Sequence, residues 1–490
     1  MPNKTRSKNR PLRVLHVAAE IFPLVKTGGL ADVTAALPQA LSKTGCEVQL
    51  LLPGLPSILE SLGAPRKLAE FGPTFGAGSV RLLRGMLPNL DAEVVVIDSP
   101  WLYRRSGGPY LDGNGQEWAD NLQRFALLGW TAAHLASGEF GNRWQPEIVH
   151  AHDWHAALAC CYLKAHPGSS ALSVFTVHNL AYQGLFPLED SSQLNLPRHY
   201  AEPYGALEFH GGLSFMKGGL TSATHITTVS PTYAREILTA EFGCRLEGVL
   251  ALRRDALTGI LNGVDTHLWD PSTDTALAAR YTSEDLTGKR VCKLALQKEF
   301  SLAAQPDAPI IGVISRLSTQ KGLDLLHDAM PEVLRTGAQL VLLGSGELEL
   351  QQDFLALAAA HPRQVGVRIG YDEELAHRIV AGADAIAIPS RFEPCGLTQL
   401  YGMRYGTLPL VRRVGGLADT VDAEVGFSFI EPESTLGSTL VALIDTYRSN
   451  PERWQSMMRR GMRRDFGWHR AAQEYSSLYR RLKENIYSER

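Results

Sequence analysis

The chain has 490 residues, of which 44% are hydrophobic and 20% charged. It is therefore long enough for two or three domains with a large packed core, and this composition excludes wholesale disorder. The formal net charge of −3 excludes a global positive field that would attract nucleic acid or an anionic membrane, so any anionic ligand must be bound by local cations.

The chain begins with MPNKTRSKNR, which is basic but lacks the apolar core of a signal peptide, and we expect a flexible basic tail over residues 1–10. No apolar run reaches the length of a membrane span. The six cysteines show no zinc-like spacing, and a chain of this length needs no disulfide bonds. A reducing cytoplasm is the expected location.

Apolar runs alternate with helical segments along almost the whole chain, which predicts parallel α/β sheets. Ser230 followed by Pro231 predicts a helix start. The polar stretch 270–290 reads as a connector. In the first half the expected strands are LRVLHVA, EVQLLLP, AEVVVID, EIVHAH, SVFTVH, HITTVS and GILNGVD (259–265); in the second they are IIGVISR, QLVLLGSG, VGVRIG, AIAIPSR, TLPLVRR and GFSFI.

This alternation predicts two α/β domains of similar size, one over 11–265 and one over 266–467. The segment GGLAD occurs at 28–32 and again at 415–419, each time between a strand and a helix, which is weak support for two related folds. The last segment, 468–490, reads as an amphipathic helix that packs back onto the first domain.

Ligands of open α/β sheets collect at the carboxyl ends of the strands, where loop amides and helix N-termini point. In VKTGGL, Lys26 with Gly28 and Gly29 stands between a strand and a helix. The glycines would let backbone N–H groups approach a ligand, and Lys26 would add a point charge. A simple glycine turn is an equally good reading, and the segment is not a Walker A loop.

Two loops of the second half follow strands in the same way. In ISRLSTQKGLD, Arg316 and Lys321 lie before a helix and suit a diphosphate, although an exposed Arg and Lys at a helix start is the alternative. In AIAIPSRFEPCGLTQLYG, Glu393 is either a ligand for sugar hydroxyls or a surface acid. Its crowded setting favours the sugar ligand.

The run VHAHDWHAAL resembles a metal cluster, since it offers His150, His152, Asp153 and His155. Hydrogen bonding to hydroxyls and packed core histidines are the commoner explanations of such a run. FTVHNLAYQG places His178 at another strand end. The chain has no D-x-D sequence, so the usual ligands of a metal-held nucleotide diphosphate are absent from it.

Taken together, the motifs KTGGLADV, HAHDWHA, TVHNLAYQG, TTVSPTYAREI, LNGVD, SRLSTQKGLDL and PSRFEPCGLTQLYG resemble the bacterial glycogen synthases, to which the starch synthases of plants are similar. The resemblance covers nearly the whole chain. It implies a GT-B fold, in which two Rossmann-like domains face each other across a deep cleft. It also implies transfer of glucose from ADP-glucose to the non-reducing end of an α-1,4-glucan, with retention of configuration and without metal or cofactor.

We expect neither nucleic acid nor a membrane as a partner. The resemblance also implies the roles of individual residues. The catalytic residues would be Glu393, His178, Arg316, Lys321 and Asp153. The donor-binding residues would be Lys26, Gly28, Gly29, Asn262, Tyr371, Cys395, Gly396, Leu397 and Thr398, with Tyr371 against the adenine. Tyr110 and Asn179 would contact sugar.

Three departures from related sequences stand out. Animal and fungal glycogen synthases carry a second Glu eight residues after the first, where this chain has Tyr401, and this difference favours ADP-glucose over UDP-glucose. The loop in DTVDAEVGFSFI, around Glu424, is shorter than usual, and Cys292 replaces a usual Asn. Neither the shortened loop nor Cys292 touches the expected phosphate or sugar residues.

Two other functions are compatible with such a sequence. A phosphorylase of the same architecture would need a lysine that holds pyridoxal phosphate, and a non-catalytic glucan-binding or regulatory protein would need no intact site. The presence of Lys26, Arg316, Lys321 and Glu393 disfavours a decayed site.

Overall fold

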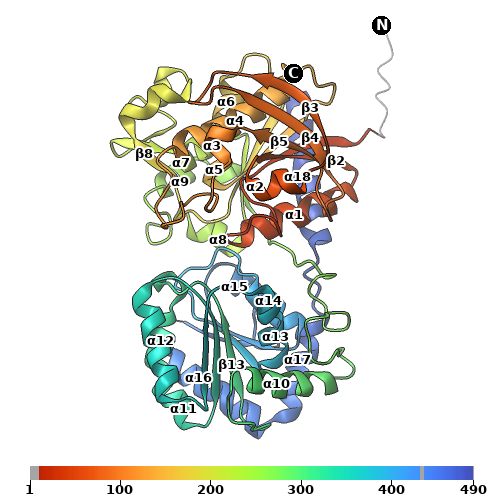
Figure 1. The fold of residues 1–490 in the computed structure, drawn as a ribbon, viewed down its shortest axis with the longest axis vertical. Helices are drawn as coiled ribbons and strands as arrows, with labels where there is room; N and C mark the ends of the chain where they lie inside the picture. Colours follow the sequence, from red (N-terminus) through yellow and green to blue (C-terminus); the bar gives the residue numbers. More distant parts are fainter. Residues whose placement is uncertain (1–9, 431–434, 489–490) are drawn as a thin grey trace. The chain divides into compact units, whose positions relative to one another are not determined.

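The computed structural model describes residues 10–430 and 435–488, and these divide into two compact units. Unit 1 comprises the chain up to Val229, Ala234–Gly263 and the segment from Trp468, whereas unit 2 comprises Ser230–Tyr233 and Val264–Gly467 (Figure 1). The chain thus enters unit 2 at Val264, two residues before the expected boundary. Except for Arg10, the expected basic tail lies outside the described residues.

Unit 1 is built on a nine-stranded sheet that is parallel except at one edge, where β3 and β4 pair antiparallel. Its central strands are buried along almost their whole length, which explains why they read as continuous apolar runs. In sheet order the strands are β12 (Leu257–Gly259), β11 (His225–Thr228), β7 (Leu172–Val177), β6 (Ile148–His152), β1 (Leu12–Val17), β2 (Cys46–Pro53), β5 (Glu93–Asp98), β4 (Val80–Met86) and β3 (Gly63–Phe71).

The helices of unit 1 include the last helix of the chain, which packs against α1. The guanidinium of Arg480 donates to the carbonyl oxygen of Thr44 at 2.7 Å, and Tyr479 is fully buried. The helices are α1 (Gly29–Ser42), α2 (Pro56–Ser61), α3 (Pro100–Tyr103), α4 (Asn121–Ser137), α5 (Asp153–Ala156), α6 (Leu158–Ala165), α7 (Phe215–Ser222), α9 (Glu247–Leu252) and α18 (Trp468–Ser488).

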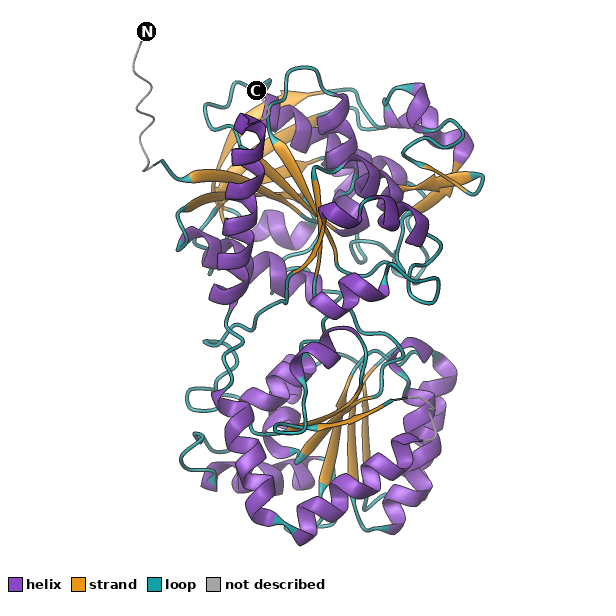
Figure 2. Ribbon diagram, turned by 180° about the vertical axis from the view of Figure 1, so that it is seen from behind, coloured by secondary structure: helices purple, strands orange, loops and turns teal. Residues whose placement is uncertain are grey.

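Unit 2 is a six-stranded parallel sheet with helices on both sides (Figure 2). In sheet order its strands are β15 (Val365–Ile369), β14 (Gln339–Gly344), β13 (Ile310–Ile314), β16 (Ala385–Ile388), β17 (Leu408–Arg412) and β18 (Phe427–Phe429). Its helices are α10 (Thr287–Glu299), α11 (Leu323–Arg335), α12 (Leu348–Ala360), α13 (Glu373–Gly382), α14 (Thr398–Arg404), α15 (Gly415–Thr420), α16 (Thr435–Ser449) and α17 (Pro451–Arg463).

Helix α8 (Pro231–Glu236) is divided between the two units and begins where the sequence predicts. The side-chain oxygen of Ser230 accepts the backbone N–H of Tyr233 at 3.2 Å, so Ser230 is the expected N-cap. In the described part of the chain, no helix is both long and apolar enough to cross a membrane.

The structure corrects three expectations about the elements. The strand expected at 259–265 is β12, which is short and ends at Gly259. The supposed connector 270–290 is packed against unit 2, where the carboxylate of Asp274 bonds to the ring of His377 and to the hydroxyl of Tyr405. The sequence analysis also missed β3, β4 and a small antiparallel sheet of β8 (Leu185–Pro187), β10 (Gly212–Ser214) and β9 (Glu208–Phe209).

Candidate active site

Each unit gathers polar side chains at the carboxyl ends of its parallel strands. In unit 1 they follow β1, β6 and β7, which are neighbours in the sheet, and in unit 2 they follow β13 and β16, which are also neighbours. Because the carboxyl ends of parallel strands lie at one edge of a sheet, residues far apart in sequence meet there. The two groups are described in turn.

In unit 1 the loop with Lys26 is held by a buried carboxylate that follows β1. One oxygen of Glu20 accepts the backbone N–H of Thr27 at 2.7 Å, and the other accepts the Thr27 hydroxyl at 2.6 Å. Glu20 is 2% exposed, and burial raises its pKa. The ammonium group of Lys26 lies 3.2 Å from a carboxylate oxygen of Asp32, on the first turns of α1. The loop is therefore a fixed structure.

The glycines of this loop differ in their surroundings. A side chain at Gly28 would meet no atom within 4 Å, so the backbone there is open to an approaching group. Gly29 is the first residue of α1, whose first N–H groups have no partner within the helix. This open helix start next to Lys26 suits an anionic group.

Tyr110 belongs to the same group, although it comes from a distant loop. Its hydroxyl donates to Glu20 at 2.5 Å, and its ring stacks on the ring of His155 at a centroid distance of 4.3 Å. Burial and the carboxylate of Glu20 raise the pKa of Tyr110 well above its usual value. Two other aromatic residues precede Tyr110 in the chain. Tyr103 is buried in the core, whereas Trp101 is 74% exposed.

Asp153 connects the ends of β6 and β7. It has a left-handed backbone with φ of 61°, and one carboxylate oxygen accepts the backbone N–H of Trp154 at 2.7 Å. The other oxygen accepts the backbone N–H groups of His178 and Asn179, at 3.2 and 3.1 Å. Burial raises the pKa of Asp153 to about 7. Its carboxylate thus fixes the backbone of the turn that carries His178.

The side chains of His178 and Asn179, on that turn, make different hydrogen bonds. The Nε2 atom of His178 lies 3.0 Å from Nδ1 of His152, and burial lowers the pKa of His178 to about 3, so its ring is neutral. The side-chain oxygen of Asn179 accepts the backbone N–H of Ala181 and closes the turn. Asn262, beyond β12, is buried, and its side-chain oxygen has no partner among the described residues.

The centre of the group in unit 2 is an ion pair. The ammonium nitrogen of Lys321 lies 2.6 Å from Oε2 of Glu393, which also accepts the hydroxyl of Ser390 at 2.9 Å. Glu393 is 7% exposed. A carboxylate held in this way by a cation and a hydroxyl has one oxygen, Oε1, left for a ligand.

Arg391 joins the two turns that carry this pair. Its guanidinium makes two 2.7 Å bonds to the carboxylate of Asp324 and one to the carbonyl oxygen of Thr319. The turns also touch at Gly322, where φ is +64° and a side chain would lie 2.1 Å from the carbonyl oxygen of Pro389. Glycine is required there, because any side chain would push the two turns apart.

The segment after Glu393 is tied to itself and to α15. The side-chain amide of Gln399 donates to the carbonyl oxygens of Cys395 and Gly396, at 3.0 and 2.8 Å. The backbone N–H of Gly416 bonds to the carbonyl oxygen of Glu393 at 3.1 Å. Leu397 and Thr398 follow directly and start α14. These expected donor residues therefore lie beside Glu393 on one braced segment.

Two further expected residues are exposed on loops that follow strands of unit 2. Arg316 is exposed just after β13, five positions before Lys321. Tyr371 is 70% exposed on the loop after the edge strand β15, and its hydroxyl contacts Glu373.

The run VHAHDWHAAL, which resembles a metal cluster, does not converge on one point. Asp153 is bound by backbone N–H groups, and His155 stacks on Tyr110. Only His150 and His152 lie in a group whose ligand atoms are all within 4.8 Å of one another, and the third member is His16. Both ring nitrogens of His150 and of His152 already have hydrogen-bond partners, so a metal would have to displace them.

A second group with metal-like composition joins α4 to α6. Glu139 contacts His134 through one oxygen, and its other oxygen lies 2.7 Å from Nε2 of His166. The backbone N–H of Gly168 bonds to Nδ1 of His166, which places the proton of that ring on Nε2, facing Glu139. The three side chains are thus satisfied as a hydrogen-bonded bridge.

The sequence analysis missed two residues of these groups, Glu20 and Arg391. Glu20 had a usable signal, because a carboxylate directly after a buried strand needs partners. Arg391 stands two residues before Glu393, but its pairing with Asp324 joins segments 67 residues apart, which no local pattern indicates.

Comparison with known proteins gives matches along almost the entire chain. Residues 13–252 match the starch synthase catalytic domain family, and residues 296–463 match the glycosyl transferases group 1 family. A glycogen synthase of Yersinia pseudotuberculosis and one of Serratia proteamaculans are each 51% identical over 483 residues, covering 96% of this chain and all of the relative. The catalytic domain of starch synthase IV from Arabidopsis thaliana, bound to ADP and acarbose, superposes with a TM-score of 0.87 and 33% identity, covering 96% of this chain and 99% of that one.

The expected fold class is confirmed, since two Rossmann-like α/β domains on parallel sheets make this a GT-B protein. The matches extend through both units and include the segments that carry Lys26, His178, Lys321 and Glu393. The chain therefore belongs to the glycogen and starch synthase family of glycosyltransferases, whose glycogen synthases transfer glucose from ADP-glucose to an α-1,4-glucan.

Proposed function

We propose that this chain extends α-1,4-glucans at their non-reducing ends with glucose from ADP-glucose, retains the anomeric configuration and releases ADP. The observation that carries this proposal is the ion pair of Lys321 with the buried Glu393 at the carboxyl edge of the unit 2 sheet. It combines a cation for a phosphate with a carboxylate that has an oxygen free for sugar hydroxyls. The relative from Arabidopsis thaliana, which was solved with ADP and acarbose, supports the same classes of ligand.

In this proposal the unit 2 group binds the donor. Lys321 and Arg316 hold the diphosphate, and Glu393 orients the hydroxyls of the glucose. Tyr371, which is 70% exposed, lies against the adenine. The backbone of the braced segment adds contacts to glucose and phosphate through Cys395, Gly396, Leu397 and Thr398.

The unit 1 group serves the sugar side of the reaction. Lys26 and the open backbone at Gly28 and Gly29 approach the donor. His178 and Asn262 contact the sugar, the latter through its unpaired side-chain oxygen. Asp153 acts as a positioning residue, because its carboxylate is bound to three backbone N–H groups. Tyr110 and Asn179 contribute to the acceptor side, and both shape their loops.

Retention follows from a reaction on one face of the sugar. As the bond from the anomeric carbon to the phosphate oxygen breaks, that oxygen takes the proton of the acceptor hydroxyl, whose oxygen bonds to the same face of the carbon. The alternative, a covalent intermediate, needs a carboxylate nucleophile. The two buried carboxylates of the unit 1 group, Glu20 and Asp153, both accept backbone N–H bonds, which supports the one-face route. Cations beside the leaving phosphate stabilise its developing charge.

We also propose a cytoplasmic location for the reaction. All six cysteines are free thiols, and five of them are buried, which is typical of proteins in a reducing compartment.

The test compares nucleoside diphosphate release from ADP-glucose and UDP-glucose, with glycogen as acceptor and EDTA present throughout. Turnover mainly with ADP-glucose, and an α-linked product by NMR, is the expected result. No diphosphate release with either donor, a requirement for added metal, or an inverted product would each overturn a stated part of the proposal.

A further inference from the structure

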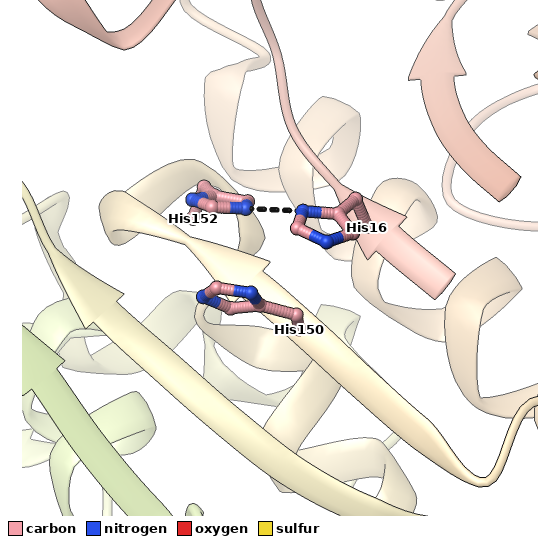
Figure 3. A group of neighbouring side chains, drawn as sticks. All are labelled: His16, His150 and His152. Carbon is pink, nitrogen blue, oxygen red and sulfur yellow. Dashed lines mark hydrogen bonds between the residues drawn. The ribbon is translucent and has the colours of Figure 1, made fainter. Parts of the chain in front are cut away.

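Three imidazole rings form a row that runs from the interior of unit 1 to the turn with His178. The Nδ1 atom of His16 lies 2.8 Å from Nε2 of His152, and Nδ1 of His152 lies 3.0 Å from Nε2 of His178. Figure 3 shows the first of these bonds, with His150 beside it. His16 and His152 are buried, whereas His178 is partly exposed.

The row follows from strand register. His16 on β1 pairs with His150 on the neighbouring strand β6. Because side chains alternate between the faces of a strand, His152 lies on the same face as His150 and reaches the ring of His16. His178 follows β7, the next strand of the sheet, and continues the row.

All three rings are neutral at pH 7, because burial lowers the pKa of each well below 6.5. A neutral imidazole has one N–H donor and one acceptor nitrogen, so each hydrogen bond in the row fixes the proton on the next ring. Only two arrangements of the row are consistent, and they run in opposite directions.

The end of the row decides between them. Nε2 of His16 is buried and has no hydrogen-bond partner among the described residues. A buried N–H without an acceptor is rarer in proteins than an acceptor without a donor. The proton of His16 is therefore on Nδ1, and it is donated to Nε2 of His152.

We infer that His16 and His152 are positioning residues that fix the tautomer of His178, so that His178 offers its Nδ1–H as a hydrogen-bond donor to an oxygen of bound sugar or phosphate. His152 accepts at Nε2 and so carries its proton on Nδ1, which it donates to Nε2 of His178. His178 is thereby left with its proton on Nδ1. The opposite direction would present a lone pair there instead. The inference rests on the proposed function only for what His178 meets in the site.

Asp153 and the row hold His178 in different ways. Asp153 accepts the backbone N–H of His178 and fixes the main chain. The row sets the ring orientation and the proton. Loss of the row should therefore leave the fold of the turn intact while it changes the hydrogen bond that His178 offers.

His150 is the matched control. Its ring lies 4.1 Å from that of His152 and 4.7 Å from that of His16, so it occupies the same core. Its nitrogens bond instead to the hydroxyls of Tyr479 and Thr176, at 2.7 and 2.5 Å. A change at His150 disturbs the same packing without interrupting the row.

The experiment is nitrogen-15 NMR of the histidine rings in the full-length protein at pH 7.5 without substrate, with each ring assigned from a single variant. The expected result for the wild type is a protonated Nδ1 on His178. A protonated Nε2 on His178 would overturn the inference, and this result does not depend on the activity of the protein. The NMR spectrum therefore tests the tautomer of His178 independently of the proposed function.

Kinetics then test the consequence. His16→Leu removes the donor and should shift His178 toward the other tautomer, with a fall in kcat of about tenfold and little change in the KM for glycogen. His16→Asn keeps a donor near the position of Nδ1 and should restore most of kcat. His150→Asn should leave the tautomer and kcat unchanged. Equal loss of kcat in all three variants, or none in His16→Leu, would contradict the inference.

Discussion

The ammonium nitrogen of Lys321 lies 2.6 Å from Oε2 of Glu393, although the two residues are 72 positions apart. Their turns follow β13 and β16, which are neighbours in the unit 2 sheet, and Arg391 binds the turns together. Each partner satisfies a charge that would be costly to leave unpaired. The pair is therefore poised before any ligand arrives, and a phosphate or a sugar would meet groups already in place.

The first prediction concerns the charge of Glu393. Glu393→Gln keeps the shape of the side chain but removes the negative charge that holds Lys321. We expect kcat with ADP-glucose to fall by about 10²- to 10³-fold, the size of effect seen when a charge-stabilising group is removed from an active site. Steady-state kinetics with glycogen as acceptor measure this.

A second ion pair of unit 2 provides the control for Glu393→Gln. Arg378 bonds to both carboxylate oxygens of Glu299, at 2.9 and 3.0 Å, on helices α13 and α10. Glu299→Gln should leave kcat within about twofold, since single exposed ion pairs contribute about 1 kcal/mol or less to stability. If Glu393→Gln behaved like this control, Glu393 would have no part in the reaction.

The second prediction is that Arg391 positions the pair rather than binding substrate as a simple charge. Arg391→Lys keeps the charge but cannot make the two parallel bonds to Asp324. We expect the KM for ADP-glucose to rise by about three- to tenfold, and the free energy of unfolding to fall by about 1–2 kcal/mol. A loss of stability with an unchanged KM would show that Arg391 serves only the fold.

Much of this fold is predictable from local sequence, because the strands of a parallel sheet are buried on both faces and read as apolar runs. The central strands of both units confirm this. The antiparallel edge formed by β3 and β4 has no such signal, since β3 is mostly exposed and rich in polar residues. The small sheet of β8, β9 and β10 is too short to show a period at all.

The residues of the active-site groups were predictable where a polar side chain follows a strand directly, as with Lys321 and Glu393. The sequence could not indicate the long-range contacts that position these residues. Tyr110 meets Glu20 across 90 residues of chain, and the segment expected to be a connector instead donates the hydroxyl of Tyr281 to the carbonyl oxygen of Tyr405 at 2.9 Å. Such contacts depend on the register of distant elements, which local pattern does not encode.

The third prediction tests the support of the Lys26 loop. Tyr110→Phe removes the hydroxyl that donates to Glu20, so that among the described residues this buried carboxylate keeps only its hydrogen bonds to Thr27 and to the backbone of Gly28. We expect the free energy of unfolding to fall by about 1–3 kcal/mol and the pKa of Glu20 to rise further, because the lost bond lowers it. The KM for ADP-glucose should rise as the loop loosens.

Tyr103 is the matched control for Tyr110→Phe. It is also buried, and its hydroxyl donates to the carbonyl oxygen of Arg124 at 2.6 Å. Tyr103→Phe should cost similar stability and leave the KM for ADP-glucose unchanged. Equal effects of the two variants on KM would mean that the hydroxyl of Tyr110 acts only through general stability.

The fourth prediction separates binding from folding at Tyr371. Its ring is 70% exposed, so Tyr371→Ala should change the free energy of unfolding by no more than about 0.5 kcal/mol. If the ring stacks on adenine, the KM for ADP-glucose should rise by about three- to tenfold, because such stacking contributes about 1 kcal/mol. Tyr204→Ala, at a site 99% exposed, is the control and should change neither quantity. An unchanged KM in Tyr371→Ala would remove Tyr371 from the donor site.

The last prediction is that unit 1 loses stability steeply below pH 6.5. Burial lowers the pKa values of several unit 1 histidines and keeps them neutral in the folded chain; five of them lie in or beside the active-site group, namely His16, His150, His152, His155 and His178. In the unfolded chain these rings take up protons below a pKa of about 6.5, so the unfolded state binds more protons and unfolding becomes easier as the pH falls. Each ring contributes about 1.4 kcal/mol per pH unit once the pH is well below 6.5.

Buried carboxylates act in the opposite direction. The pKa of Asp153 is raised from 3.8 to about 7, so from pH 7 down to about 4 the folded chain holds a proton that the unfolded chain has lost, and this favours folding as the pH falls. Glu20, whose pKa is also raised, acts in the same sense. These five histidines contribute more than the two carboxylates, and His225, whose pKa burial lowers to about 4, acts in the same direction as the five, so the net loss should be at least about 4 kcal/mol per pH unit near pH 5. Urea unfolding at pH 7.5, 6.0 and 5.0 measures it, and His150→Asn should reduce the slope by about one ring's share. A flat profile, or an unchanged slope in that variant, would mean that these rings are charged in the folded protein, and a charged His16 or His152 could no longer set the tautomer of His178.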